Sequence, residues 1–357
     1  MSGKAPSLWL RTAAVFVLLA LVVVYAVGCG GQGKPSGEEQ KESGKESTEK
    51  ASEEKKESAI TPTNIVITTG SAGTGWYASG AKIAEILMAE IPGLNVSVVE
   101  GGGVANLKLV NEGRNADIGY AETAAFQEAL AGTGEFTEKA TNLAGLAAIS
   151  RDYLQIVVPA KSDIYKIEDF KDKRLLPTKK GWGTEVMMRR LLELYGMTYD
   201  TIRQAGGNVS FTSMGEMPAL VKDGHADIMC VRGAVPLGIV LELEASTPIR
   251  LIPIEKEKIQ EFLEKYPGYI ETEIPANTYK GQTEPVPGLG IRTILMIRKD
   301  LPEDLVYKIT KALYENREQI NSSFPDYNID AEETFKAFKE SEIHPGALKY
   351  YKEIAGK

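Results

Sequence analysis

Cysteine and histidine are nearly absent from this chain of 357 residues, which contains two of each. These residues are the common ligands of zinc, and cysteines in even numbers form the disulfide frameworks of small exported domains. Two scattered residues of each kind predict neither a zinc cluster nor a disulfide framework. We therefore expect no metal site.

Basic residues are outnumbered by acidic ones. The chain has 41 Lys and Arg against 49 Asp and Glu, which gives a formal net charge of −8. A protein that binds nucleic acid needs a positive face toward the phosphates. The acidic balance therefore argues against a nucleic-acid partner.

The N-terminal segment is typical of an export signal. Lys4 and Arg11 precede an uncharged, mostly apolar run at 12–27. This run suits the hydrophobic part of a signal peptide and is short for a membrane span, which needs about 20 residues. The segment ends Ala-Val-Gly-Cys and is similar to a bacterial lipobox, which makes Cys29 the expected lipidation site and 1–28 the signal peptide. An ordinary signal and an uncleaved anchor are the alternatives, and all three place the body outside the cytoplasm.

A polar segment separates this signal from the rest of the chain. Residues 30–58 are almost entirely Gly, Ser, Glu, Lys, Gln and Thr. Such a composition buries too little apolar surface to offset the entropy lost on ordering. We expect 29–59 to be a disordered tether between a membrane anchor and a globular body.

The body repeats one pattern of strands and helices. A strand, a glycine-rich turn and a helix are predicted at 64–89 and again at 173–195. Each copy continues with a second strand, a second helix that ends at a glycine, and the tripeptide Ala-Asp-Ile. Three pairs of matched points lie 108 to 111 residues apart: Gly75 with Gly183, Gly113 with Gly224, and Asp117 with Asp227.

Strands that alternate with helices predict an α/β fold with a mostly parallel sheet in each of two lobes. The stretches 148–158 and 290–298 are predicted to join the lobes as a hinge of two crossing strands. We expect 60–152 with 290–357 to form lobe I, and 153–289 to form lobe II.

The two glycine turns predict where a ligand binds. In parallel sheets, ligands lie beyond the carboxyl ends of the strands. Each turn also begins a helix, so backbone N–H groups and positive helix ends point inward from both lobes and favour a small anion such as a carboxylate. The expected ligand contacts are Ser71, Gly73, Thr74, Gly75, Tyr77, Gly103, Glu122, Trp182, Gly183, Thr184 and Arg232.

Two charged members of this set have specific expected roles. Arg232, at a strand end, is expected to fork onto a carboxylate of the ligand, the alternative being a pair with a surface carboxylate. Glu122 facing an ammonium group would favour an amino acid over a simple dicarboxylate. For the glycine turns and the aromatic residues, the alternatives are a tight strand-to-helix turn and ordinary core packing.

Four segments resemble a known family. They are TTGSAGTGWY at 68–77, the run from Glu-Gly to Ala-Asp-Ile-Gly at 112–119, NTYKGQ at 277–282 and HPGALKYY at 344–351. They are similar to the TAXI-type solute receptors of tripartite ATP-independent periplasmic (TRAP) transporters, over nearly the whole body.

This resemblance implies a periplasmic-binding-protein fold of type II, no catalysis and no cofactor. It implies delivery of an organic anion or an amino acid such as glutamate to the subunits of a TRAP permease in the membrane. The chain departs from the family pattern at Glu122, at Lys179–Lys180 and at Arg232, all of them near the expected ligand.

Two other functions are compatible with parts of the sequence. Residues 73–78 fit the dinucleotide pattern G-x-G-x-x-A, with Glu100 at the end of the next strand, as in an NAD-dependent enzyme. The repetition of the turn in the second lobe and the expected export both argue against an enzyme. A tethered sensor that binds the same solute without transporting it is the other alternative.

Overall fold

The structure is a computed structural model that describes residues 63–324 and 326–356. The predicted signal, Cys29 and the predicted tether lie outside these residues. Every described element lies within Glu57–Lys357. In the described ranges, no helix is both long enough and apolar enough to cross a membrane.

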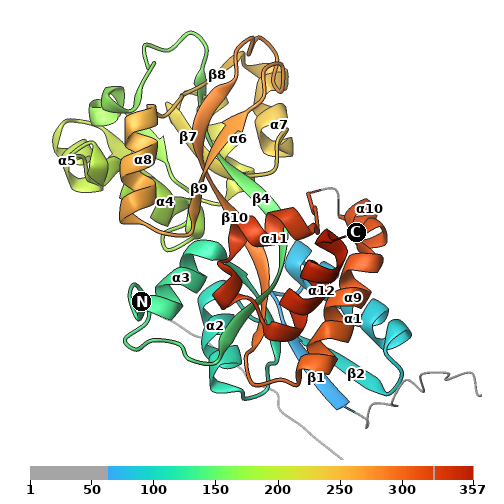
Figure 1. The fold of residues 1–357 in the computed structure, drawn as a ribbon. Helices are drawn as coiled ribbons and strands as arrows, with labels where there is room; N and C mark the ends of the chain where they lie inside the picture. The colour runs from blue at the N-terminus through green and yellow to red at the C-terminus, as the bar shows by residue number, and fades with distance from the viewer. Residues whose placement is uncertain (1–62, 325, 357) are drawn as a thin grey trace, which may run out of the picture. The chain divides into compact units, whose positions relative to one another are not determined.

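One half of the sheet, which we call lobe I with its helices, has the strand order β2-β1-β3-β10-β4 (Figure 1). The strands β1, β2 and β3 are parallel, and β10 is antiparallel to both of its neighbours. The first elements of this half are β1 (Thr63–Thr68), α1 (Gly75–Glu90), β2 (Leu94–Val99), α2 (Gly103–Glu112), β3 (Ile118–Glu122) and α3 (Thr123–Ala131).

The other half, lobe II, repeats this arrangement with the order β6-β5-β7-β4. Again the first three strands are parallel and the fourth is antiparallel. Its elements are η1 (Ile167–Asp172), β5 (Arg174–Leu176), α4 (Gly183–Leu194), α5 (Tyr199–Gln204), β6 (Asn208–Val209), η2 (Met214–Glu216), α6 (Met217–Lys222), β7 (Ile228–Gly233), α7 (Gly238–Ser246), β8 (Ile249–Leu251), α8 (Lys256–Lys265) and β9 (Tyr269–Ile274). The predicted two-lobed α/β fold of periplasmic-binding-protein type II is therefore confirmed.

Two long strands connect the lobes. β4 (Leu143–Pro159) and β10 (Val286–Arg298) pair in antiparallel fashion, and the register is shifted twice near its middle. Toward one end, β4 pairs with β7 and β8, and β10 pairs with β9. These are the two crossing strands that the sequence predicts.

The remaining elements return to lobe I, on which the C-terminal helices pack (Figure 1). His344 precedes the last helix, and its Nδ1 accepts a hydrogen bond from the backbone N–H of Gly346 at 3.1 Å, so this histidine caps the terminal helix. The elements are α9 (Glu303–Glu315), α10 (Arg317–Ser323), α11 (Ala331–Ala337), η3 (Glu340–Glu342) and α12 (Pro345–Ala355).

Separate apolar cores support the two lobes. One core draws its buried residues from 65–149 and 294–351. Two further cores draw theirs from 154–291, with Ala124 as an addition from lobe I. The lobe boundaries expected from the sequence, at 152–153 and 289–290, stay a prediction.

The repeated Ala-Asp-Ile tripeptide has the same structural role in both lobes. Asp117 accepts hydrogen bonds from the backbone N–H of Val66 (2.8 Å) and from Arg298 (2.9 Å). Asp227 accepts them from the backbone N–H and the Nη2 of Arg174, at 2.8 and 2.5 Å. In each lobe this carboxylate ties the third strand to the first, where the third strand enters the sheet.

One predicted strand is shorter than expected. The sequence predicts a strand at 208–212, but β6 contains two residues. The backbone N–H of Ser210 donates to the carbonyl of Leu175 and is the last contact of this strand with β5. Further along the chain, the side chain of Glu216 accepts hydrogen bonds from Thr212 and Ser213, where η2 begins. Capping of the short helix therefore displaces the last part of the strand.

Candidate functional site

The two glycine turns have the same backbone geometry. Gly73 and Gly181 have positive φ angles of 84° and 83°, a region in which a side chain is strained. In both turns the next residue, Thr74 or Trp182, donates its N–H to the carbonyl three residues earlier at 3.1 Å. Thr74 and Trp182 are also the N-cap residues of α1 and α4, so the sequence repeat is a structural repeat.

Four helices begin around one cavity of about 560 Å³ between the lobes. Its lining includes Trp76 near the start of α1, Gly103 at the start of α2, Ala124 in the first turn of α3, and Gly183 at the start of α4. The positive ends of these helices favour an anionic group. In Figure 1, α3 of lobe I lies next to α4 of lobe II.

A buried arginine lies beside this cavity and bridges the lobes. Arg232 on β7 is 10% exposed, and its Nη2 and Nη1 donate to the two carboxylate oxygens of Glu122 at the end of β3. Its Nε lies 3.5 Å from Oδ2 of Asp152 on β4. Burial lowers the pKa of Arg232, but the two carboxylates outweigh it and raise the pKa, so the guanidinium stays charged.

Asp152 is the more distant of the two carboxyl partners of Arg232. Burial raises the pKa of its carboxyl; the positive charge of Arg232 opposes that shift and the negative charge of Glu122 adds to it. Two carboxyl groups thus share one guanidinium.

Glycine at position 183 allows this bridge to lie against the helix. A Cβ on Gly183 would lie 2.7 Å from Nη1 of Arg232 and 3.0 Å from Oε2 of Glu122. The backbone at Gly183 is not strained, so the requirement for glycine comes from close approach alone. Gly183, Glu122 and Arg232 are therefore three predicted site residues that the structure brings together.

A second ion pair joins the lobes within the same cavity. Arg190 of α4 donates to Glu128 of α3 at 2.5 Å and to the hydroxyl of Tyr269 at 3.2 Å. Its guanidinium also lies 4.8 Å from the ring centre of Tyr266. The sequence prediction missed this pair, although Arg190 follows Gly183 by seven residues and so lies on the same helix face.

The other predicted contacts lie at varying distances from the cavity. Gly103 lines it, and so does Trp76, which the prediction did not include and which precedes the predicted Tyr77. Trp182 is 49% exposed beside Lys179, whose ammonium lies 5.2 Å from the ring centre. Eight predicted residues are not among the lining residues, and their contact with a ligand stays a prediction: Ser71, Gly73, Thr74, Gly75, Tyr77, Trp182, Thr184 and Arg232.

Thr178 is a second residue that the sequence prediction missed. It lies two residues after the end of β5 and precedes the second glycine turn, with a positive φ of 78° that a β-branched residue rarely adopts. Its side chain is fully buried, and its hydroxyl has no hydrogen-bond partner among the described residues. The repeat of glycine turns in the sequence does not predict a buried threonine with a positive φ.

Solved structures of binding proteins resemble the body only distantly. A TctC solute-binding protein from Polaromonas is 16% identical, with 82% of this chain and 98% of that chain covered and a TM-score of 0.49. A putative sulfonate-binding protein SsuA from Methylobacillus flagellatus is 15% identical, with 75% and 74% covered and a TM-score of 0.45. At these TM-scores the assignment of the fold rests on the strand topology instead.

The family assignment comes from the sequence. A family model described as the NMT1-like family matches residues 67–355, which include both lobes, both glycine turns and the interlobe cavity. The match covers well over half of the chain, so the chain belongs to the NMT1-like family.

Proposed function

We propose that this chain is a solute receptor of the TAXI type that captures a small organic acid or amino acid between its lobes. The observation that carries the proposal is Arg232, a buried guanidinium beside a cavity where four helices begin. A forked guanidinium and a helix N-terminus are both suited to a carboxylate. The proposed ligand contacts are those expected from the sequence, with Arg232 as the carboxylate anchor.

The charges around the cavity bear on the kind of solute. Its lining contains the acidic side chains of Glu122, Glu128 and Glu135 and the basic ones of Arg189 and Arg190. A lining with both signs suits a solute that has an ammonium group as well as a carboxylate. A glutamate-like amino acid therefore fits better than a dicarboxylate.

The proposed receptor is held at the outer face of the cell membrane by a lipid on Cys29. The polar composition of 29–59 supports a tether between that anchor and lobes formed by 60–152 with 290–357 and by 153–289. Metabolic labelling with a fatty-acid analogue tests the anchor. The wild-type chain should take up the label and the Cys29→Ser chain should not.

The proposed partner is a TRAP permease in the membrane. Uptake of solute into vesicles that contain the permease subunits should depend on the added receptor. Binding of solute without any such uptake would indicate a sensor instead.

Isothermal titration of the full chain in detergent against organic acids, amino acids and NAD tests the solute class. Saturable binding of one organic acid or amino acid supports the receptor. Binding of NAD alone would favour the enzyme.

A further inference from the structure

A carboxylate of the chain itself lies at the place that suits the solute's carboxylate. Glu122 presents its two carboxylate oxygens to two nitrogens of Arg232, which is the forked geometry of a free carboxylate on arginine. The same carboxylate lies close to the start of α4, since a Cβ on Gly183 would lie 3.0 Å from its Oε2. The positive end of a helix and a guanidinium thus both act on Glu122.

Glu122 and the groups that it contacts come from different lobes. Arg232 and Gly183 belong to lobe II, whereas Glu122 ends β3 of lobe I. Glu122 reaches this position only when the lobes lie together.

The ion pairs of Arg232 with Glu122 and Asp152 disfavour a third carboxylate beside them. Glu122 and Asp152 already share the one guanidinium of Arg232. A solute carboxylate added beside both of them would lie next to two other carboxyl groups, in a site where solvent screens poorly. A solute carboxylate that binds both Nη1 and Nη2 of Arg232 takes the nitrogens that Glu122 contacts, so it replaces Glu122.

We propose that Glu122 is an internal stand-in for the solute's carboxylate, which holds the lobes together on Arg232 until a solute displaces it. The inference rests on the proposed function, because it assumes a solute with a carboxylate. It makes Glu122 a competitor of the solute, not a contact for an ammonium group.

Succinate separates these two roles, because it has carboxylates and no ammonium group. Titration of succinate and L-glutamate into the full chain in detergent compares the wild type with Glu122→Gln. We expect Glu122→Gln to bind succinate at least fivefold more tightly than the wild type. Glu138→Gln, which removes an exposed charge of lobe I outside the cavity, is the control and should bind as the wild type does.

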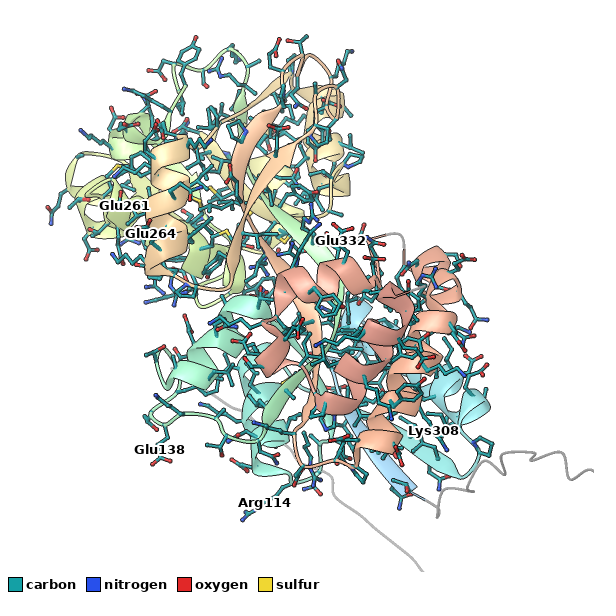
Figure 2. The ribbon with its side chains drawn as sticks, viewed as in Figure 1. Arg114, Glu138, Glu261, Glu264, Lys308 and Glu332 are labelled. Atoms are coloured by element: carbon teal, nitrogen blue, oxygen red, sulfur yellow. The ribbon has the colours of Figure 1, made fainter. Side chains whose placement is uncertain are left out.

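A measurement without any ligand tests the same inference. Nitroxide labels at Arg114→Cys in lobe I and Glu264→Cys in lobe II, both exposed and labelled in Figure 2, report the distance between the lobes. The background carries Cys29→Ser, and the other cysteine, Cys230, is buried. In Glu122→Gln the distance distribution should become broader and extend to longer values than with Glu122 intact.

The outcomes distinguish the two proposals. The proposal that Glu122 stands in for the solute's carboxylate is overturned if Glu122→Gln binds succinate with unchanged or lower affinity. It is also overturned if Glu122→Gln loses affinity for L-glutamate only. If neither probe binds any variant, the proposed solute class fails, and the label distances decide the inference: an unchanged distribution overturns it.

Discussion

Arg151 on β4 and Arg292 on β10 lie directly opposite each other in the register of the crossing strands. Like charges in that position repel. Both arginines donate to Glu333 of α11, at 2.7 and 3.1 Å, one to each carboxylate oxygen. A residue from the C-terminal helices thus stabilises the hinge at the point where its strands cross.

Replacing Glu333 should destabilise the fold. In Glu333→Gln the repulsion between the arginines is unopposed, and Arg292, only 7% exposed, loses its charged partner. We expect the free energy of unfolding to fall by roughly 2–3 kcal/mol. Denaturant unfolding at pH 7 measures this, with Glu332→Gln as the control: Glu332 precedes it, is 77% exposed and should cost less than about 0.5 kcal/mol. Equal effects of the two variants would contradict the role of Glu333.

The contribution of Glu333 should disappear in acid. Burial alone would raise the pKa of its carboxyl, but the hydrogen bonds and charges of Arg151 and Arg292 outweigh burial and lower the pKa from 4.5 to about 2. A carboxyl with a lowered folded-state pKa stabilises the fold above its unfolded value and loses that effect as the pH falls. The difference between wild type and Glu333→Gln should therefore be constant above pH 4.5 and shrink from there toward pH 2. A difference that grows in acid would contradict this account.

Alanine at the start of α4 should have the opposite effect to alanine at the start of α1. Gly183→Ala places a Cβ 2.7 Å from Arg232, which must displace the bridge to Glu122, at a cost of about 1–2 kcal/mol. Gly75 is the matching position of lobe I, and no heavy atom lies within 4 Å of its added Cβ. Gly75→Ala should therefore raise the free energy of unfolding, by up to about 1 kcal/mol from helix propensity. Thermal and denaturant unfolding compare them, and stabilisation by both variants would show that Gly183 is not in close contact with the bridge.

The buried hydroxyl of Thr178 should lower stability. Thr178→Val keeps the shape and the β-branch and removes a polar group that has no partner among the described residues, which should stabilise the fold by about 1 kcal/mol. Thr310 is equally buried, but its hydroxyl donates to the carbonyl of Val306 at 2.7 Å. Thr310→Val should therefore be destabilising or neutral. Destabilisation by Thr178→Val in the same unfolding assay would mean that the hydroxyl has a partner, such as bound water.

The sequence predicted the fold well because its signals are local. The turns at Gly73 and Gly181 depend on residues close to one another in the chain. The tripeptides at Asp117 and Asp227 were recognisable because they repeat, although their carboxylates bind residues 51 and 53 positions earlier. The crossing strands were also predictable, since each is rich in apolar and β-branched residues.

The site was predicted only in part, because its contacts join distant segments. Glu122 and Arg232 were expected to contact a ligand, but their pairing with each other depends on how the lobes meet. The pair of Arg190 with Glu128 and the position of Glu333 between two arginines depend on tertiary packing in the same way. Periodicity and motif spacing carry no information on such contacts.

The central claim is that a solute's carboxylate binds Arg232 in the cavity between the lobes. Isothermal titration of organic acids and amino acids into the full chain, with Arg232→Lys beside the wild type, tests it most directly. Lysine keeps the charge and loses the fork, so we expect one solute to bind the wild type at micromolar or tighter affinity and Arg232→Lys at least about tenfold more weakly. Arg203→Lys, at an exposed arginine of lobe II, should bind as the wild type does. Equal affinity of Arg232→Lys and wild type, or a response to NAD and to no acid, would contradict the account.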